Sequence, residues 1–460
     1  MVLPTVKHRR VRAESWGMGL PTIATRRAAF ALAAVACGAV LGLSPSVASA
    51  APTAPVTPSD TLYADQSALQ ADAAIGAPQA WRLTRGAGAV VAVLDTGVLE
   101  SHPDLTGQLW TNSGEVAGNG KDDDRNGYVD DVHGVDLVNR DGDPADDEGH
   151  GTHIAGIIAA KADGDGAVGL ANQAKIMAIK VLDARRGGTA DTVAQGVLYA
   201  VGNGADVINI SINGAGTSES LKSAIRIAGA AGVPVVASAG NDGDNLGLVP
   251  SYPASYPDAA VVGVGATKGD TILASFSNFG RGVELTAPGV GILSTSSTGG
   301  YELRDGTSMA APFVAAALAM LHSVRPELAG TELQATLEAT ARHPSNLLGK
   351  VAAGAIDVAA ALRSLVPEDQ WPTQADPPVL TARVKRTTSG RSGRALITWT
   401  LTGDVSQVSR YRVTLGGKTL ARRSGGGARG LYVPRRKGRA TLVALSSTGA
   451  RIAVARVTIK

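Results

Sequence analysis

The 460-residue sequence predicts an α/β fold with a mostly parallel central sheet in three layers, followed by a small all-β, sandwich-like domain. Two observations carry this prediction. As far as about residue 365, short β-branched runs bounded by Gly, Asp or Asn alternate with segments of helical spacing. Such runs are typical of strands buried on both faces of a parallel sheet. Beyond residue 378, the runs instead alternate apolar and polar residues and are separated by Gly- and Ser-rich turns.

Each expected element follows from its local pattern. Strands that alternate with helices imply crossover connections, which place helices on both faces of the sheet. The runs expected as strands of the parallel sheet are 89–94, 175–181, 205–212, 233–239 and 259–264. The segments expected as helices are 192–202, 218–231 and 308–323. In the all-β region, the expected strands are 380–385, 395–401, 410–415, 439–444 and 451–459.

Composition excludes a disordered protein and a disulfide-built one. Apolar residues make up 44% of the chain and charged residues 18%, which is enough for a full-sized core. The single cysteine, Cys37, lies within an N-terminal apolar run and can form no disulfide within the chain. Stability must therefore come from packing, hydrogen bonds and bound ions.

The net charge of +3 conceals two regions of opposite charge. Residues 51–372 hold 37 Asp and Glu against 19 Lys and Arg, a net charge of −18. Residues 373–460 hold 18 Lys and Arg against two Asp, a net charge of +16. The asymmetry leaves two hypotheses open: the basic region binds anionic cell-wall or surface polymers, or it docks on the acidic region. We expect no specific nucleic-acid partner and a monomeric protein.

The N-terminus is typical of an export signal. Arg26-Arg27 precede an apolar stretch that ends at Leu43, and Ala48-Ser49-Ala50 supplies a small-residue cleavage site. The stretch is short for a membrane span, which disfavours a membrane anchor. We therefore expect a secreted, extracellular protein cleaved after Ala50, with no transmembrane anchor in the mature chain.

These patterns together predict the organisation of the chain. The predicted parts are a signal peptide (1–50), a short N-terminal segment (51–62), the α/β domain (63–365), a Pro-, Asp- and Gln-rich linker (366–378) and the basic all-β domain (379–460).

Two motifs contain groups suited to acid–base chemistry. The first expected strand ends at Asp95, at the edge of the sheet where open α/β folds bind ligands, although a lone Asp there also suits a turn. The second motif, 149–156, holds His150 and His153. Their i,i+3 spacing shares a helix face, so they could bind zinc together. No second ligand-rich motif accompanies them, and the alternative is that His150 is a base while His153 is structural.

The third motif is Asp305-Gly306-Thr307-Ser308-Met309, which opens a long Ala-rich helix. A serine at this place faces unpaired N–H groups and the positive end of the helix dipole, which favour a developing oxyanion. For Ser308 taken by itself, an ordinary helix cap is the better interpretation.

In the chain, Asp95, His150 and Ser308 follow one another in the order known for the triad of subtilisin. Asp95-Thr96-Gly97, the 149–156 motif and Gly306-Thr307-Ser308-Met309-Ala310-Ala311-Pro312 resemble the three signature motifs of the subtilisin-like serine proteases, the subtilases. The approach to His150 is similar to that of the thermitase-like branch. The resemblance covers about 63–365 and implies a subtilisin-like three-layer fold and a serine endopeptidase.

The resemblance also implies the role of each residue. Ser308 would attack the peptide carbonyl, His150 would act as the base, and Asp95 would orient the imidazole. The segment around Asn241 resembles the oxyanion segment of the family, which would place the Asn241 amide beside the tetrahedral intermediate. Catalysis would need no cofactor.

Substrate-binding segments are also implied by the resemblance. Where subtilases usually have glycine, this chain has Asn213 and Ser251, so the pocket is altered and its preferred side chain is left open. The edge that would pair with an extended substrate is Ser211, Ile212, Asn213 and Gly214, and the pocket residues are Ser238, Ala239, Gly240 and Ser251.

Acidic loops predict structural Ca²⁺. The segment 122–131 resembles the first half of an EF-hand loop, but position 12 is His133 instead of Glu. The predicted ligands here are Asp122, Asp124, Asn126 and Asp130. A second acidic cluster comprises Asp141, Asp143, Asp146 and Asp147. The resemblance implies a further site built from Asp104, Asp163 and Asp165.

Three functions compete at this point. An active endopeptidase is favoured because every triad and oxyanion residue is present. A non-catalytic adhesin on a subtilase scaffold is disfavoured for the same reason. In the third, the scaffold is catalytically incidental and the basic C-terminal domain binds anionic surface polymers. The short distance from Ala50 to Trp81 also leads us to expect no inhibitory prodomain.

Overall fold

The computed structural model describes residues 56–367, apart from 71, 72, 74 and 270, and the backbone of the strands between 379 and 459. The expected signal peptide (1–50), residues 51–55 and most of the expected linker (366–378) lie outside the described residues.

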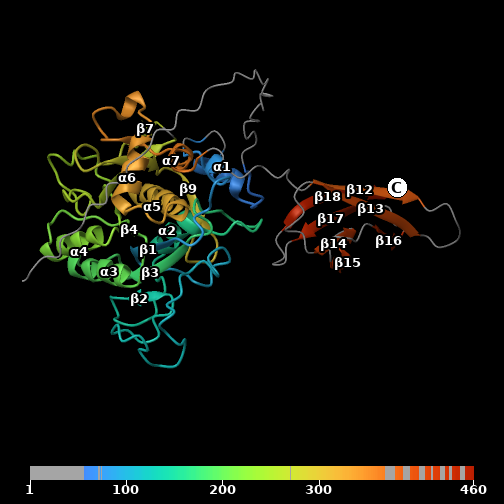
Figure 1. Ribbon diagram of the computed structural model, residues 1–460, viewed down its shortest axis with the longest axis horizontal. Helices are drawn as coiled ribbons and strands as arrows, with labels where there is room; N and C mark the ends of the chain where they lie inside the picture. The colour runs from blue at the N-terminus through green and yellow to red at the C-terminus, as the bar shows by residue number, and fades with distance from the viewer. Residues whose placement is uncertain are drawn as a thin grey trace, which may run out of the picture. The chain divides into compact units, whose positions relative to one another are not determined.

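A nine-stranded sheet forms the centre of the α/β region (Figure 1). Along the path β11-β8-β6-β5-β4-β1-β3-β2 all neighbours are parallel, and β7 pairs antiparallel with β6. The strands are β1 (Val90–Asp95), β2 (Gly134–Asp136), β3 (Lys175–Lys180), β4 (Val207–Ile210), β5 (Val235–Ser238), β6 (Val261–Lys268), β7 (Ile272–Leu273), β8 (Leu285–Pro288) and β11 (Gly354–Ala355).

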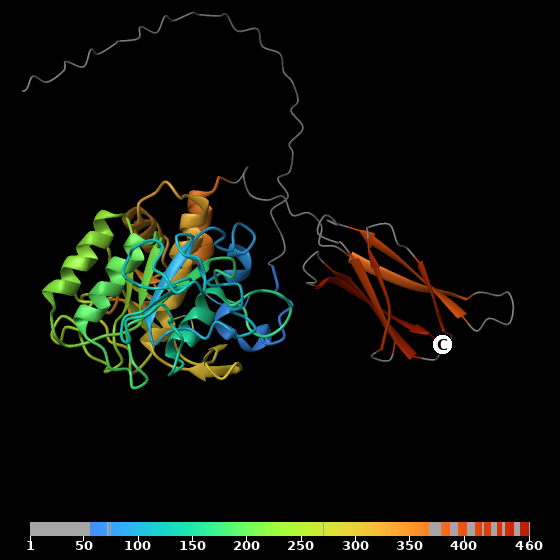
Figure 2. The same cartoon turned by 90° about the horizontal axis from the view of Figure 1, so that it is seen from below.

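Helices cover both faces of this sheet. Alternate residues of β1 enter two separate cores: Val91 and Val93 pack with α2 and α5, whereas Ala92 and Leu94 pack with α3 and α4. The helices are α1 (Ala77–Ala80), α2 (His150–Ala159), α3 (Ala190–Gly202), α4 (Glu219–Ala230), α5 (Thr307–Val324), α6 (Gly330–Ala339) and α7 (Val358–Leu365). Figures 1 and 2 show α3 and α4 together on the side of the sheet opposite α5. The predicted three-layer α/β fold is therefore confirmed.

Local sequence explains where the outer helices begin. The side chains of Thr189, Ser218 and Asp357 each accept a hydrogen bond from a backbone N–H in the first turn of α3, α4 and α7. Helix α5 is apolar on every side because it runs through the core. Among the described residues, α5 is the one helix that is both long enough and apolar enough to cross a membrane. Most of it is buried within the protein.

A two-stranded antiparallel hairpin precedes α5. Its strands are β9 (Ile292–Thr295) and β10 (Tyr301–Arg304). Three short 3-10 turns complete the described elements of this region: Tyr63–Asp65, Ser67–Leu69 and Ser345–Leu347.

The C-terminal region contains two antiparallel sheets, ordered β12-β13-β16 and β15-β14-β17-β18. The strands are β12 (Val379–Arg386), β13 (Arg394–Thr402), β14 (Arg410–Leu415), β15 (Lys418–Ser424), β16 (Gly430–Pro434), β17 (Gly438–Leu445) and β18 (Arg451–Ile459). All five strands expected here are present, and the sequence pattern missed β15 and β16. β15 lies between Gly-rich segments and carries adjacent arginines that break the alternation, and β16 is only five residues long and ends at Pro434.

Candidate active site

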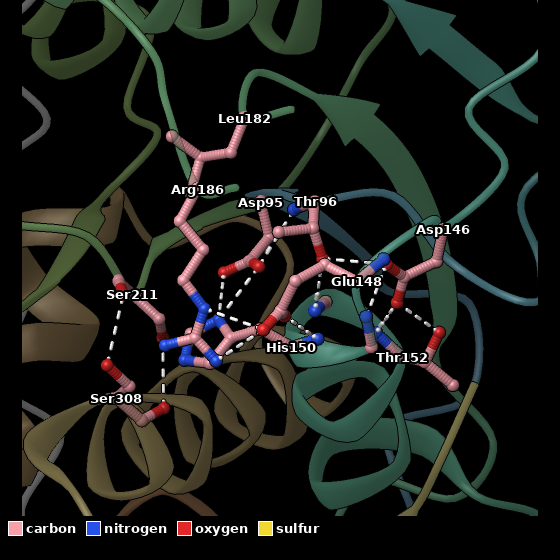
Figure 3. A network of polar contacts seen from close by, with 12 residues as sticks. Asp95, Thr96, Asp146, Glu148, His150, Thr152, Leu182, Arg186, Ser211 and Ser308 are labelled. Carbon is pink, nitrogen blue, oxygen red and sulfur yellow. Dashed lines mark hydrogen bonds and ion pairs between the residues drawn. The ribbon is translucent and has the colours of Figure 1, made fainter. Parts of the chain in front are cut away.

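The pair formed by Asp95 and His150 lies at the carboxyl edge of the central sheet. Asp95 is the last residue of β1, and its carboxylate is fully buried. His150 opens α2, and its Nδ1 lies 2.8 and 2.9 Å from the two carboxylate oxygens (Figure 3). The Thr96 backbone N–H donates to the same carboxylate at 2.8 Å. Because Nδ1 donates to Asp95, Nε2 is left as the basic nitrogen.

Acidic residues before His150 hold the start of α2 in place. Asp146 accepts backbone N–H bonds from Gly149 at 2.8 Å and Thr152 at 2.9 Å. Burial opposes its ionisation, but hydrogen bonds, led by that from the Thr152 hydroxyl, lower the pKa of Asp146. Glu148 accepts from the His150 N–H at 2.8 Å and forms an ion pair with Arg186, as Figure 3 shows. Asp146, predicted in the second acidic cluster, is thus a partner of the helix N-terminus.

A buried lysine lies behind the same sheet edge. Lys180 ends β3 directly opposite Asp95, and its side chain is 1% exposed. Its ammonium donates to Asp147 at 2.6 Å and to the carbonyl oxygens of Thr96 at 2.7 Å and Leu182 at 2.9 Å. This lysine cross-links three segments that surround the Asp95–His150 pair, and its charge is compensated within the chain.

Ser308 lies in the first turn of α5, which contacts α2, the helix that carries His150. Its hydroxyl donates to the carbonyl oxygen of Ser211 at 3.0 Å (Figure 3). Among the described residues, it has no hydrogen bond to His150. The Ser211 hydroxyl in turn donates to the Ser308 carbonyl at 3.0 Å, so the two residues join the end of β4 to the start of α5.

The Asn241 side chain is held by Thr307. Its Oδ1 accepts from the Thr307 backbone N–H at 2.8 Å and from the Thr307 hydroxyl at 3.0 Å. The Thr307 hydroxyl accepts in turn from the Gly240 N–H at 3.1 Å. A Cβ at Gly306, whose φ is +151°, would lie 3.6 Å from Ser308 N and 3.7 Å from Asn241 Nδ2. The two nitrogens therefore both lie close to Gly306, at the start of α5.

The backbone of the edge segment 211–214 is partly paired with another segment of the same chain. Gly214 exchanges both backbone hydrogen bonds with Tyr252, at 2.9 and 2.8 Å. The backbone groups of Ile212 and Asn213 have no partner among the described residues. Beside them is a cavity of about 210 Å³ lined mainly by apolar side chains, including Leu182, Val193 and Leu221.

The two positions that depart from the family pattern contact each other. Asn213 Nδ2 donates to Ser251 Oγ at 3.1 Å. Both lie beside Gly240, whose φ is +106° and where a Cβ would come within 2.4 Å of the Asn278 amide. Glycine is therefore required at position 240. Ser238 and Ala239 are fully buried at the end of β5 and its loop.

His153 has a structural environment. It is fully buried, and its Nε2 lies 3.2 Å from the carbonyl oxygens of Ile292 and Glu302. Burial, as the main cause, lowers the pKa of His153 to about 4. Because His150 is turned to Asp95 and His153 to the β9–β10 hairpin, the arrangement does not suit a zinc ion shared by both.

In the acidic loop 112–131, the residues whose carboxylate oxygens lie close together differ from the predicted ligand set. Asp122 accepts from the Gly127 N–H and Asp130 from the Gly120 N–H, both at 2.9 Å. Carboxylate oxygens of Glu115, Asp124 and Asp131 lie within 4.8 Å of one another, and the Asn126 amide bonds to the last two. The sequence prediction did not include Glu115 or Asp131.

A second group of carboxylates surrounds the loop 163–166. Asp60 accepts from the backbone N–H of Asp163 at 3.0 Å, and Asp104 from that of Ala167 at 2.9 Å. Burial, reinforced by the charge of Asp163, raises the pKa of both Asp60 and Asp104 to about 6. Asp165 accepts from the Thr61 hydroxyl at 3.2 Å. Asp60 was missed because it precedes the first strand by about thirty residues and no motif marks it.

These features define a class of protein first. A serine at a helix N-terminus, a histidine paired with a buried aspartate, and an amide beside the serine are the groups of a serine hydrolase on an α/β fold.

Comparison with known proteins then identifies the family. The model of the subtilase family matches residues 86–374. Thermitase of Thermoactinomyces vulgaris is 38% identical over 268 residues, which are 58% of this chain and 86% of the relative. Subtilisin Savinase of Lederbergia lenta is 37% identical over 280 residues, 60% of this chain and 92% of the relative. The cell wall-associated protease of Bacillus subtilis is 40% identical over 253 residues, 55% of this chain and 25% of the relative.

A solved structure agrees with the sequence matches. A protease from Pseudoalteromonas arctica superposes with a TM-score of 0.58 at 30% identity, covering 67% of this chain and all of that one. The chain belongs to the subtilase family, on its thermitase-like branch, and is a serine-type endopeptidase that acts on proteins or peptides.

Proposed function

We propose that Ser308, His150, Asp95 and Asn241 carry out peptide hydrolysis in this subtilase. The observation that carries the proposal is the joint geometry: His150 Nδ1 bonds to the buried Asp95, while Ser308 N and Asn241 Nδ2 both lie close to Gly306. On substrate binding, the Ser308 hydroxyl turns from the Ser211 carbonyl to His150 Nε2. Catalytic hydrogen bonds often tighten only in the substrate complex.

The reaction then proceeds in two halves. Ser308 Oγ bonds to the peptide carbonyl carbon while its proton passes to His150 Nε2, and the carbonyl oxygen becomes an oxyanion between Ser308 N–H and Asn241 Nδ2. The peptide C–N bond breaks as Nε2 returns the proton to the leaving amine. Water attacks the acyl-enzyme by the same route and releases Ser308. Asp95 stabilises the imidazolium throughout and stays ionised.

Replacement of the nucleophile tests this assignment. Ser308→Ala should lower kcat on a chromogenic peptide by about a millionfold, the loss known for the same change in subtilisin. Ser323→Ala is the matched control and should retain activity. It removes a hydroxyl that bonds to the Met320 carbonyl of α5 and to the Thr84 hydroxyl. Substantial hydrolysis by Ser308→Ala, or its labelling by a serine-directed fluorophosphonate, would contradict the assignment.

The altered pocket bears on specificity. The Asn213–Ser251 hydrogen bond joins two segments on either side of Gly240, in the place that binds the residue before the cut in this fold. The bridge shortens the pocket and leaves polar groups in it. We infer a preference for small side chains at this substrate position, since a long apolar one would have to break the bridge.

Calcium is proposed as a structural ion. The residues that would hold it are Asp60, Asp104 and the 163–165 loop in one site, and Glu115, Asp124 and Asp131 in another. In the first site, burial raises the pKa of Asp60 and Asp104, so a cation would supply the missing positive charge. In the second site, the carboxylate oxygens of Glu115, Asp124 and Asp131 lie close enough together to bind one ion. No step of the hydrolysis uses it.

Chelation tests the ion proposal. In the Ser308→Ala protein, which cannot digest itself, EDTA should lower Tm by roughly 5–15 °C, and excess Ca²⁺ should restore it. Asp60→Asn should remove most of this shift. An unchanged Tm in EDTA would refute the proposal.

We also propose that the protein is secreted after removal of residues 1–50. The support is the sequence of that segment alone. Expression in a secreting bacterial host should give an extracellular product that begins at Ala51, as read by N-terminal sequencing, and retention of the whole chain in the cell would contradict it.

A further inference from the structure

The four-stranded sheet β15-β14-β17-β18 brings arginines from separate strands onto one face. Residues directly opposite each other in neighbouring antiparallel strands share a face, and so do alternate residues along one strand. Arg412 is opposite Arg422 in β15 and Val443 in β17, and Arg456 in β18 is opposite Thr441. By these rules one face, called the arginine face here, holds six arginines and three apolar residues: Arg410, Arg412, Arg422, Arg439, Arg451 and Arg456, with Val443, Leu445 and Val454.

The opposite face of the same sheet is apolar. It holds Tyr411, Val413, Leu415, Leu442, Ala444, Ala455 and Val457, with Lys418 and Arg423 as its charged members. A sheet with one mainly apolar face and one mainly polar face buries the apolar one. From this pattern we expect the apolar face to pack in the sandwich and the arginine face to be in contact with solvent.

The arginine face is destabilising by itself. Arg412 and Arg422 lie directly opposite, and like charges in such a pair repel each other. The strands β12 to β18 contain no Asp or Glu, and after Asp376 the sequence holds a single acid, Asp404. The strands themselves supply no carboxylate to balance these positive charges, so an anion from outside the two sheets is the natural partner.

The composition of the face indicates the chemistry of that anion. Residues 373–460 hold 14 Arg and 4 Lys, and the planar guanidinium binds phosphate in a bidentate manner. Arg412 and Arg422 are about 5 Å apart across strands, and Arg410 and Arg412 are about 7 Å apart along β14. Several guanidinium groups gathered on one face suit a linear polymer with repeated anionic groups.

Nucleic acids are disfavoured as that polymer. Proteins that bind single strands stack bases on aromatic side chains that lie between the basic ones. Register places Tyr411 on the apolar face, and Trp399 and Tyr432 belong to the other sheet. We propose that the arginine face binds a base-free phosphate polymer and tethers the peptidase to surfaces that carry one.

The test uses the full chain with Ser308→Ala and fluorescently labelled inorganic polyphosphate. Replacing Arg410, Arg412 and Arg422 by Gln should weaken binding at least about tenfold and lower the slope of log K against log salt by about 2. The matched control replaces Arg383, Lys385 and Arg394 by Gln, which removes the same charge from one face of the β12-β13-β16 sheet. It should weaken binding less than about threefold.

Several results would overturn the proposal. These are equal weakening by both triple variants, no binding by the parent, or equally tight binding of single-stranded DNA or polyglutamate of the same charge. Melting curves check that each variant folds. If the triple variant unfolds, Arg412→Gln alone should still weaken binding by about threefold, and no change would count against the face. Hydrolysis of a small peptide by the Ser308-containing triple variant should be unaffected, which separates this proposal from the catalytic one.

Discussion

The peptidase region and the C-terminal sheets differ in whether their charged side chains have partners of opposite charge close by. Near the active site, charged groups find partners within the chain: His150 on Asp95, Lys180 on Asp147, and Arg186 on Glu148. On the arginine face, Arg412 meets Arg422 across the strands, and no carboxylate lies in the surrounding strands.

The difference separates two ways of using charge. Partners within the chain hold groups in one geometry before substrate arrives, which is what catalysis requires. Charges without such partners keep their attraction for an outside ligand, at some cost in stability. Three predictions examine the first half of this comparison, ordered from the largest expected effect to the smallest.

Removal of the preorganised amide should have the largest effect. Asn241→Ala should lower kcat on a small peptide by about 100- to 1000-fold, the range known for an oxyanion-hole amide of subtilisin, with little change in KM. Steady-state kinetics at saturating substrate measure it. A fall of less than threefold would show that the amide does not stabilise the oxyanion.

The positioning role of Thr307 provides the control for that result. Thr307→Val removes one of the two hydrogen bonds that hold Asn241 Oδ1 and should lower kcat by about tenfold. Adding Thr307→Val to Asn241→Ala should then have almost no further effect, because the residue to be positioned is gone. Full additivity would mean that Thr307 acts by another route.

Loss of the buried cation should have an intermediate effect on stability. Lys180→Met leaves the carbonyl oxygens of Thr96 and Leu182 without their donor and Asp147 without its partner. We expect the free energy of unfolding to fall by about 2 kcal/mol. Urea denaturation in the Ser308→Ala protein measures this loss.

The matched control for Lys180 is a lysine on the surface. Lys222→Met breaks an exposed pair with Glu219 and should change stability by less than about 0.5 kcal/mol. Equal losses in the free energy of unfolding from both substitutions would show that the buried interactions of Lys180 stabilise the protein no more than an exposed ion pair does.

Opening the bridged pocket should have the smallest effect. In the double variant Asn213→Gly with Ser251→Gly, the ratio of kcat/KM for phenylalanine over alanine before the cut should rise about tenfold. A panel of otherwise identical peptides measures the ratio. Either single variant breaks the hydrogen bond, so if neither raises the ratio, the bond between the two side chains is not what closes the pocket.

Predictions from sequence succeeded where the signal is local. The strands of the parallel sheet are continuous β-branched runs, so β1, β3, β4, β5 and β6 were expected at nearly their observed positions. Short elements such as β2 and β11 were missed because they acquire their pairing from neighbours. The predicted EF-hand-like ligand set differs from the observed cluster because loop folding, which spacing does not encode, turned Asp122 and Asp130 toward backbone N–H groups.

The sequence by itself determined the family, the order of Asp95, His150 and Ser308, and the division of charge between the two regions, since each is written in residue type and spacing. Only the tertiary structure decided which groups meet. It placed Thr307 on Asn241, Lys180 beneath the catalytic edge and Asn213 against Ser251, and it added Asp60 to the acidic site. Such contacts join segments from two to over one hundred residues apart, and the folded backbone alone brings the distant ones within hydrogen-bonding distance.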